Sequence, residues 1–177
     1  MRTRAVLFDR DGTLVENVPY NADRGLVRCK ATARQALRDC RSSGLLVGVV
    51  TNQSGIGRGW FSSDAAWEVA AEIECQLGKF DVWRMCEHAP WDSCNCRKPK
   101  PGLIVSAAKA LGIRPDECVV IGDSLVDIEA ARAGGARSIL VPDSGKSTQG
   151  MMQDSPIAQN LVQAVSLILD WEAAPVH

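Results

Sequence analysis

The sequence predicts a three-layer α/β fold of Rossmann-like type, in which helices cover both faces of a parallel sheet. Short apolar runs alternate with segments of helical periodicity, and this is the order of elements typical of a parallel sheet. Runs such as Cys118-Val119-Val120-Ile121 are continuously apolar, which fits strands buried on both faces. The chain has 177 residues, and we expect residues 1–177 to form one domain.

The expected strands are rich in branched residues and are bounded by polar or glycine-containing segments. The first begins near the start of the chain, where Ala5-Val6-Leu7-Phe8 leads into Asp9. The five strands are expected at 5–9, 45–51, 81–85, 118–122 and 137–141.

Helical patterns separate most of these runs. The expected helices span 32–43, 64–77, 101–111, 124–133 and 157–171. In the first helix, Thr32 and Gln35 have the spacing of a capping box, and Gly44 follows as a stop signal. The second and third helices end at Gly78 and Gly112. The polar segment 142–156 is expected to form a loop before the last helix.

Composition restricts the classes of function and location. The formal net charge of -1 lacks the basic excess of a non-specific nucleic-acid binder. No apolar run approaches the roughly 18 residues of a membrane span. The apolar stretch that follows Arg4 is too short for a signal peptide. We therefore expect a cytoplasmic monomer with no nucleic-acid or membrane partner.

The seven cysteines do not predict disulfide bonds. Their odd number and the lack of a secretory signal argue against a disulfide framework. Cys40 and Cys75 are expected on apolar helical faces and Cys118 in a strand, so these three are expected to be small core residues.

Polar side chains follow several of the expected strands. Asp9 and Asp11 end the first strand, Thr51 and Asn52 end the second, and Asp123 follows the fourth. In addition, Lys98 precedes a helix between the third and fourth strands. Ligands of parallel sheets bind beyond the carboxyl ends of the strands. We therefore expect these side chains to meet at one edge of the sheet.

These residue types suit phosphoryl transfer from a small phosphorylated substrate. Asp9 and Asp123 offer hard oxygens to Mg²⁺, and Asp9 can attack phosphorus to form an aspartyl phosphate. Asp11 can protonate the leaving oxygen and later deprotonate water. Thr51 and Lys98 can stabilise the transferring phosphoryl oxygens.

Each motif also has a simpler interpretation when it is taken alone. Asp-x-Asp-Gly at 9–12 could be a turn or part of a calcium loop. Thr51 could merely end a strand. Ser124 and Asp127 could be a helix-capping pair. Their joint occurrence in this order favours the catalytic interpretation.

A second constellation has the chemistry of a zinc site. In the loop 86–96, Cys86, His88, Cys94 and Cys96 offer three thiolates and an imidazole, which can surround a tetrahedral Zn²⁺. Four protein ligands leave no open position, so we expect a structural zinc rather than a catalytic one. The alternative is a set of reduced, unligated cysteines.

Four segments together resemble the motifs of the haloacid-dehalogenase superfamily of phosphohydrolases. They are Asp9-Arg10-Asp11-Gly12-Thr13, Thr51-Asn52-Gln53-Ser54-Gly55, Cys96-Arg97-Lys98-Pro99, and Gly122-Asp123-Ser124 with Asp127. The resemblance implies Asp9 as nucleophile and Asp11 as general acid and base. It implies Mg²⁺ on Asp9, Asp123 and the backbone carbonyl of Asp11, with Asp127 orienting Lys98 or a metal-bound water. The intervals between the motifs are too short for a large cap domain.

The zinc loop followed by Arg97-Lys98-Pro99 resembles two groups within this superfamily. These are the D-glycero-D-manno-heptose 1,7-bisphosphate 7-phosphatases and the histidinol-phosphate phosphatases. The segment 17–20 and the run 53–59 favour the first group, whereas the short interval between His88 and Cys94 is typical of the second. The substrate contacts expected from the first group are Asn17, Tyr20, Asn52, Gln53, Ser54 and Arg97.

Two other functions remain as alternatives at this point. A zinc-stapled nucleic-acid-binding module without catalysis would not need the aspartate pair or Lys98. A phosphatase that acts on DNA ends would share the Asp-x-Asp-Gly-Thr motif, but the sequence has no evident basic groove.

Overall fold

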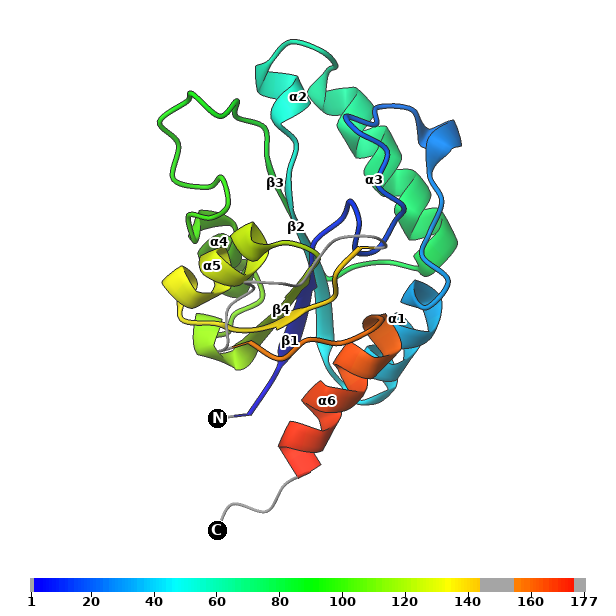
Figure 1. The fold of residues 1–177 in the computed structure, drawn as a ribbon, viewed down its shortest axis with the longest axis vertical. Helices are drawn as coiled ribbons and strands as arrows, with labels where there is room; N and C mark the ends of the chain where they lie inside the picture. The colour runs from blue at the N-terminus through cyan, green and yellow to red at the C-terminus, as the bar shows by residue number, and fades with distance from the viewer. Residues whose placement is uncertain (1, 144–154, 174–177) are drawn as a thin grey trace.

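A computed structural model describes residues 2–143 and 155–173 of the chain (Figure 1). Its centre is a sheet of five parallel strands in the order β3-β2-β1-β4-β5, which confirms the predicted fold class. Each strand lies within one residue of its expected position. The strands are β1 (Ala5–Phe8), β2 (Leu46–Asn52), β3 (Val82–Cys86), β4 (Cys118–Gly122) and β5 (Arg137–Leu140).

Helices cover both faces of this sheet. The helices are α1 (Ala33–Ser42), α2 (Ser54–Gly57), α3 (Ser63–Leu77), α4 (Gly102–Ala110), α5 (Leu125–Gly134) and α6 (Leu161–Ala173). Helices α1, α3 and α6 pack on one face, and α4 and α5 on the other (Figure 1). Two short 3₁₀ turns, Arg24–Leu26 and Pro115–Glu117, were not predicted. Among the described residues, no helix is long and apolar enough to cross a membrane.

The first strand shows why the runs are continuously apolar. In β1, Val6 and Phe8 join the core beneath α1, α3 and α6, whereas Ala5 and Leu7 join the core beneath α4 and α5. All four side chains have no exposed surface. Because alternate residues of a strand point to opposite faces, a strand between two helical layers must be apolar at every position.

The expected start of the last helix at residue 157 is wrong. Residues 156–158 instead extend the edge of the sheet, because Leu140 donates to the carbonyl of Pro156 and accepts from the amide of Ala158. The helix begins only after Asn160, whose side chain accepts a hydrogen bond from the amide of Gln163 at 3.0 Å. Of the expected loop 142–156, residues 144–154 lie outside the described part of the chain.

Two smaller expectations also fail. Thr32 precedes α1, but its backbone is helical and its side chain makes no capping bond. Gln35 therefore does not complete a capping box, and its amide donates to Asp39 at 2.6 Å. Cys75 is exposed, because the buried face of α3 is formed by residues such as Ile73 and Leu77. The expected burial of Cys40 and Cys118 is confirmed.

The two-layered core predicts the effect of truncating a single helix residue. Ile104 in α4 is completely buried, whereas its neighbour Val105 is 43% exposed. We expect Ile104→Ala to lower the free energy of unfolding by about 2–5 kcal/mol, since it leaves a cavity between α4 and the sheet. Val105→Ala is the matched control and should change it by about 0.5 kcal/mol or less. Urea denaturation followed by circular dichroism measures both, and equal effects would contradict the assigned core.

Candidate active site

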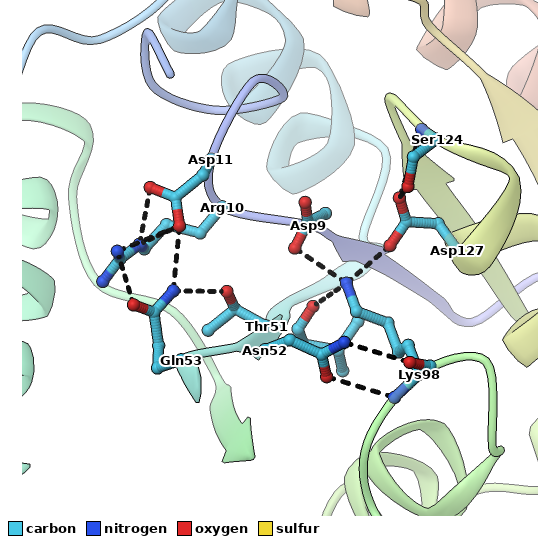
Figure 2. A network of polar contacts seen from close by, with 10 residues as sticks. Asp9, Arg10, Asp11, Thr51, Asn52, Gln53, Lys98, Ser124 and Asp127 are labelled. Carbon is cyan, nitrogen blue, oxygen red and sulfur yellow. Dashed lines mark hydrogen bonds and ion pairs between the residues drawn. The ribbon is translucent and has the colours of Figure 1, made fainter. Parts of the chain in front are cut away.

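The carboxyl ends of the strands bring the predicted polar residues to one edge of the sheet (Figure 2). Asp9 directly follows β1, Thr51 lies near the end of β2, and Asp123 follows β4. Lys98 reaches the same place from the segment between β3 and α4 and is in direct contact with Asp9. The convergence expected from the parallel topology is therefore present.

Lys98 lies at the centre of this edge with its ammonium group buried. Its Nζ donates to Asp9 Oδ1 at 2.8 Å, to Asp127 Oδ1 at 2.5 Å and to the carbonyl oxygen of Val50 at 2.9 Å. The side chain is only 3% exposed. An ammonium group has three hydrogens. Each of them therefore has an acceptor, so the buried charge is fully hydrogen-bonded.

Burial and charge act in opposite directions on these groups. Burial raises the pKa of Asp9 to about 7, opposed by Lys98 and reinforced by the charge of Asp127. Burial acts to lower the pKa of Lys98, but Asp127 and Asp9 outweigh it and raise that pKa above its usual value. A carboxylate buried in this way requires more positive charge nearby to stay ionised at neutral pH.

The acidic residues fit a divalent cation. Asp9, Asp123 and Asp127 each place a carboxylate oxygen within 4.8 Å of the others. Lys98 and Ser124 each bind one oxygen of Asp127, and Asp9 and Asp123 remain the predicted ligands. Hard oxygen ligands of this kind suit Mg²⁺. The carboxylate of Asp11 is not a member of this group, and a role for its backbone carbonyl remains a prediction.

Two glycines allow the backbone to approach these carboxylates. Gly12 has a φ of 81°, and a Cβ atom there would lie 2.6 Å from Asp123 Oδ2. A Cβ atom on Gly122 would lie 2.4 Å from Cγ of Asp127. A larger residue at either position would therefore displace an acidic side chain of the site.

Asp127 serves both of the functions that the sequence left open. Its Oδ2 accepts from the hydroxyl of Ser124 at 2.6 Å and from the amide of Ser124 at 3.3 Å, which forms the capping box of α5. Its Oδ1 accepts from Lys98. The helix cap thus fixes the carboxylate that orients the ammonium group.

Asp11 belongs to a separate network. Its carboxylate pairs with the guanidinium of Arg10 at 2.9 Å and accepts from Nε2 of Gln53 at 2.8 Å. The same amide nitrogen donates to Oγ1 of Thr51 at 2.9 Å. Sequence reasoning did not assign a role to Arg10. The available signal was an arginine placed between two aspartates at the end of a strand.

Two of the expected substrate contacts are engaged with the protein. The side-chain amide of Asn52 donates to the carbonyl of Lys98 and accepts from its amide, both at 3.1 Å. Asn52 therefore holds the main chain of Lys98. Gln53 is only 4% exposed, and both ends of its amide bind Arg10, Asp11 or Thr51.

The other expected contacts lie on the loops around this edge. Asn17 and Tyr20 are exposed, and Tyr20 lies edge-on against Trp60 at 4.3 Å between ring centroids. Ser54 begins helix α2 and is partly exposed. Arg97 has a buried Nη1 atom with no hydrogen-bond partner among the described residues. This last group is suited to an anionic ligand.

The predicted zinc loop brings its four residues together. Sγ of Cys86 lies 3.8 Å from Sγ of Cys94 and 3.6 Å from Nδ1 of His88. Sγ of Cys96 lies closer, 3.1 Å from Cys86 and 3.2 Å from His88. A tetrahedral zinc with Zn–S bonds of ~2.3 Å separates two sulfurs by about 3.8 Å. The donor set is that of a Zn²⁺ site, and the separation of Cys86 and Cys94 matches this value, whereas Cys86 and Cys96 lie closer together than two zinc-bound sulfurs do.

The zinc loop is packed against the active-site side of the molecule. A Cβ atom on Gly57 would lie 2.4 Å from the amide nitrogen of Ala89, so α2 rests directly on the backbone of the loop. The guanidinium of Arg58 lies 4.9 Å from the ring centroids of both Trp60 and Trp91. Trp91 belongs to the zinc loop. The stacking of Trp91, Arg58 and Trp60 therefore joins the zinc loop to the segment after β2.

Comparison with known proteins places this arrangement in a family. A HAD-hydrolase-like family model matches residues 95–167. A D-glycero-β-D-manno-heptose-1,7-bisphosphate 7-phosphatase of Haemophilus ducreyi is 31% identical and covers 95% of this chain and 100% of its own length. The phosphatase of the same name from Rhodopseudomonas palustris is 36% identical over 76% of this chain and 81% of its own.

Solved structures of phosphatases also superpose on this chain. The D,D-heptose 1,7-bisphosphate phosphatase of B. bronchiseptica, complexed with magnesium and phosphate, superposes with a TM-score of 0.86. It is 25% identical, and the match covers 96% of this chain and 99% of that one. A HAD-like phosphatase from Mesorhizobium loti superposes with a TM-score of 0.81 at 27% identity, covering 97% and 87% of the two chains.

The cysteine cluster predicts a bound metal. We expect about one zinc per chain in protein purified without chelator, because four ligands close a tetrahedral site. Cys94→Ser and Cys96→Ser should both lower the zinc content and the thermal stability. Cys75→Ser is the matched control, since Cys75 is exposed and lies outside the cluster. Metal analysis that finds no zinc in the unsubstituted protein would contradict the site.

Proposed function

Because the chain belongs to the haloacid-dehalogenase-like family of phosphoric monoester hydrolases, we propose that it removes the 7-phosphate of D-glycero-D-manno-heptose 1,7-bisphosphate. The observation that supports this most is the pair formed by Lys98 and Arg97. Lys98 is buried against the nucleophile, whereas the neighbouring Arg97 has an unpaired guanidinium nitrogen. A bisphosphate offers one anion to each of these cations.

In the proposed reaction, Asp9 attacks phosphorus and the bond from phosphorus to the sugar oxygen breaks. Asp11 gives a proton to the departing oxygen and then takes one from water. That water attacks the aspartyl phosphate, releases inorganic phosphate and restores Asp9. The hydroxyl of Thr51 and the ammonium of Lys98 stabilise the phosphoryl oxygens.

Mg²⁺ is the proposed cofactor at the acidic edge. Asp9, Asp123 and the backbone carbonyl of Asp11 would hold it, and when bound it would neutralise charge on the phosphoryl group. The donor set of the site supports this proposal. Asp9, Asp123 and Asp127 each place a carboxylate oxygen within 4.8 Å of the others. Carboxylate oxygens are hard ligands of the kind that Mg²⁺ prefers.

Zn²⁺ is the proposed structural metal of the loop 86–96, held by the cluster described above. Because Arg97 and Lys98 follow Cys96 directly, the metal would also fix the start of the segment that carries both cations. Asn17, Tyr20 and Ser54 are the proposed contacts to the sugar hydroxyls from the surrounding loops.

Histidinol phosphate is the competing substrate within the same catalytic mechanism. It carries one phosphate, so it would leave Arg97 without an anionic partner. Two relatives that bear the heptose name match 95% and 93% of this chain. A zinc-stapled nucleic-acid module without catalysis would have no use for a buried lysine between two aspartates.

The proposed mechanism predicts how substitution of Asp9 and Asp11 changes phosphate release. Asp9→Asn should abolish phosphate release, because an amide cannot attack phosphorus, and Asp11→Asn should slow it by roughly 10²-fold or more. Circular dichroism should report an intact fold in both variants. The exposed Glu129→Gln, on the outer side of α5, is the control and should retain full activity. Near-normal turnover by Asp9→Asn would rule out the mechanism.

The proposed substrate predicts which phosphate ester the enzyme hydrolyses best. The unsubstituted enzyme should have a higher kcat/KM for heptose 1,7-bisphosphate than for histidinol phosphate. Arg97→Ala should raise KM for the bisphosphate with little change in kcat, because it removes binding energy remote from the reaction. The same variant should treat heptose 7-phosphate as the unsubstituted enzyme does. A tenfold preference for histidinol phosphate, equivalent to about 1.4 kcal/mol, would refute the heptose assignment and leave the catalytic residues standing.

A further inference from the structure

Arg10 is the largest of the fully buried side chains in the described part of the chain. It is 1% exposed, and its Nη1 atom has no hydrogen-bond partner among the described residues. A buried donor without a partner lowers the stability of the fold. Replacement of a buried ion pair by apolar residues is often neutral or stabilising. Stability alone therefore does not explain an arginine at this position.

The rest of the Arg10 guanidinium is directed at one carboxylate. Nε lies 3.1 Å from both oxygens of Asp11, and Nη2 lies 2.9 Å from Oδ2 of Asp11. The same Nη2 donates to Oε1 of Gln53 at 2.8 Å. Arg10 therefore contacts both Asp11 and the amide that contacts Asp11.

Gln53 completes the arrangement in a single orientation. Its oxygen must face Arg10, which has only donors, and its nitrogen must face the carboxylate of Asp11, which has only acceptors when ionised. The nitrogen also donates to Oγ1 of Thr51, so the hydroxyl hydrogen of Thr51 is left to point elsewhere. One amide thus orients both the carboxylate and the hydroxyl.

Figure 2 shows the carboxylates of Asp9 and Asp11 turned toward different partners. The carboxylate of Asp11 is turned toward Arg10 and Gln53, whereas that of Asp9 is turned toward Lys98. Asp11 is 27% exposed, so it borders the open side of the site rather than the core. The two carboxylates are therefore held by different cations, Asp11 by Arg10 and Asp9 by Lys98.

We propose that Arg10 and Gln53 are positioning residues, which act through Asp11 by holding its carboxylate where it can exchange a proton with the leaving oxygen. They form an internal clamp, defined here as the contacts of Arg10 and Gln53 to Asp11. Fixed placement of an acid–base group within reach of its proton is what makes its transfer efficient. This inference rests on the proposed function, because it assigns a role to residues that touch its acid–base group.

The test uses the chemistry of the leaving group. A sugar alkoxide needs a proton as it departs, whereas a nitrophenolate is stable without one. Loss of the clamp should therefore slow hydrolysis of a sugar phosphate far more than that of p-nitrophenyl phosphate. The parameter to compare is kcat/KM, which covers the steps up to departure of the leaving group and excludes later hydrolysis of the aspartyl phosphate.

We expect Arg10→Met to lower kcat/KM for the heptose phosphate by roughly 10- to 100-fold, up to the scale of acid–base catalysis. For p-nitrophenyl phosphate we expect a loss below about threefold. Gln53→Met keeps the arginine and removes only the amide. It should show the same selectivity between the two esters, with a smaller loss of kcat/KM. If Arg10→Met does not fold, Gln53→Met still tests the clamp. Arg114→Met is the matched control, since Arg114 is an exposed arginine paired with Asp116.

A double variant separates positioning from general damage. If Arg10 acts through Asp11, then Arg10→Met combined with Asp11→Asn should be no slower than Asp11→Asn alone. Equal losses for both substrates, or additive losses in the double variant, would overturn the clamp and leave the phosphatase assignment intact. If the unsubstituted enzyme hydrolyses neither the sugar phosphate nor p-nitrophenyl phosphate, the proposed function is refuted, and the clamp with it.

Discussion

The buried ammonium of Lys98 is the constraint on which the site depends. A charge removed from water is tolerated only when its hydrogens have partners, and here the three acceptors come from Asp9 after β1, Val50 in β2 and Asp127 in α5. Asn52 holds the main chain of the same lysine. The register of two strands, the start of α5 and the end of the zinc loop are therefore fixed at a single point. The loss of any one acceptor would leave a buried N–H of this ammonium group without a hydrogen bond.

The sequence was sufficient to predict the elements that follow from topology. Parallel strands send their carboxyl ends to the same edge, so Asp9, Thr51 and Asp123 could be placed together without any knowledge of side-chain geometry. The clustering of Cys86, His88, Cys94 and Cys96 could be predicted for a different reason, because these residues lie close in sequence and their donor types are specific. The comparisons agree with the family that the motifs resemble. The roles of the individual aspartates come from that resemblance and stay predictions.

Other features depend on partners that are distant in sequence and could not be predicted. Asn52 and Gln53 were expected to bind substrate, yet each binds protein groups far along the chain, such as Lys98 and Asp11. A polar residue near a site can bind either a ligand or the protein itself, and its side-chain rotamer decides which.

The start of α6 was misplaced because it, too, depends on a partner that is distant in sequence. Residues 156–158 are apolar enough for a helix, but a backbone pairing with Leu140 holds them extended.

The strand order also has a consequence for synthesis of the chain. Ala5 pairs with Leu46 on one side and with Cys118 on the other, so β1 is translated before both of the strands that flank it. Until β4 emerges from the ribosome, one edge of β1 has unpaired backbone groups and apolar side chains. Such an edge is a template for association with other chains. Between the translation of β2 and of β4, this edge of a nascent chain is therefore open to such association.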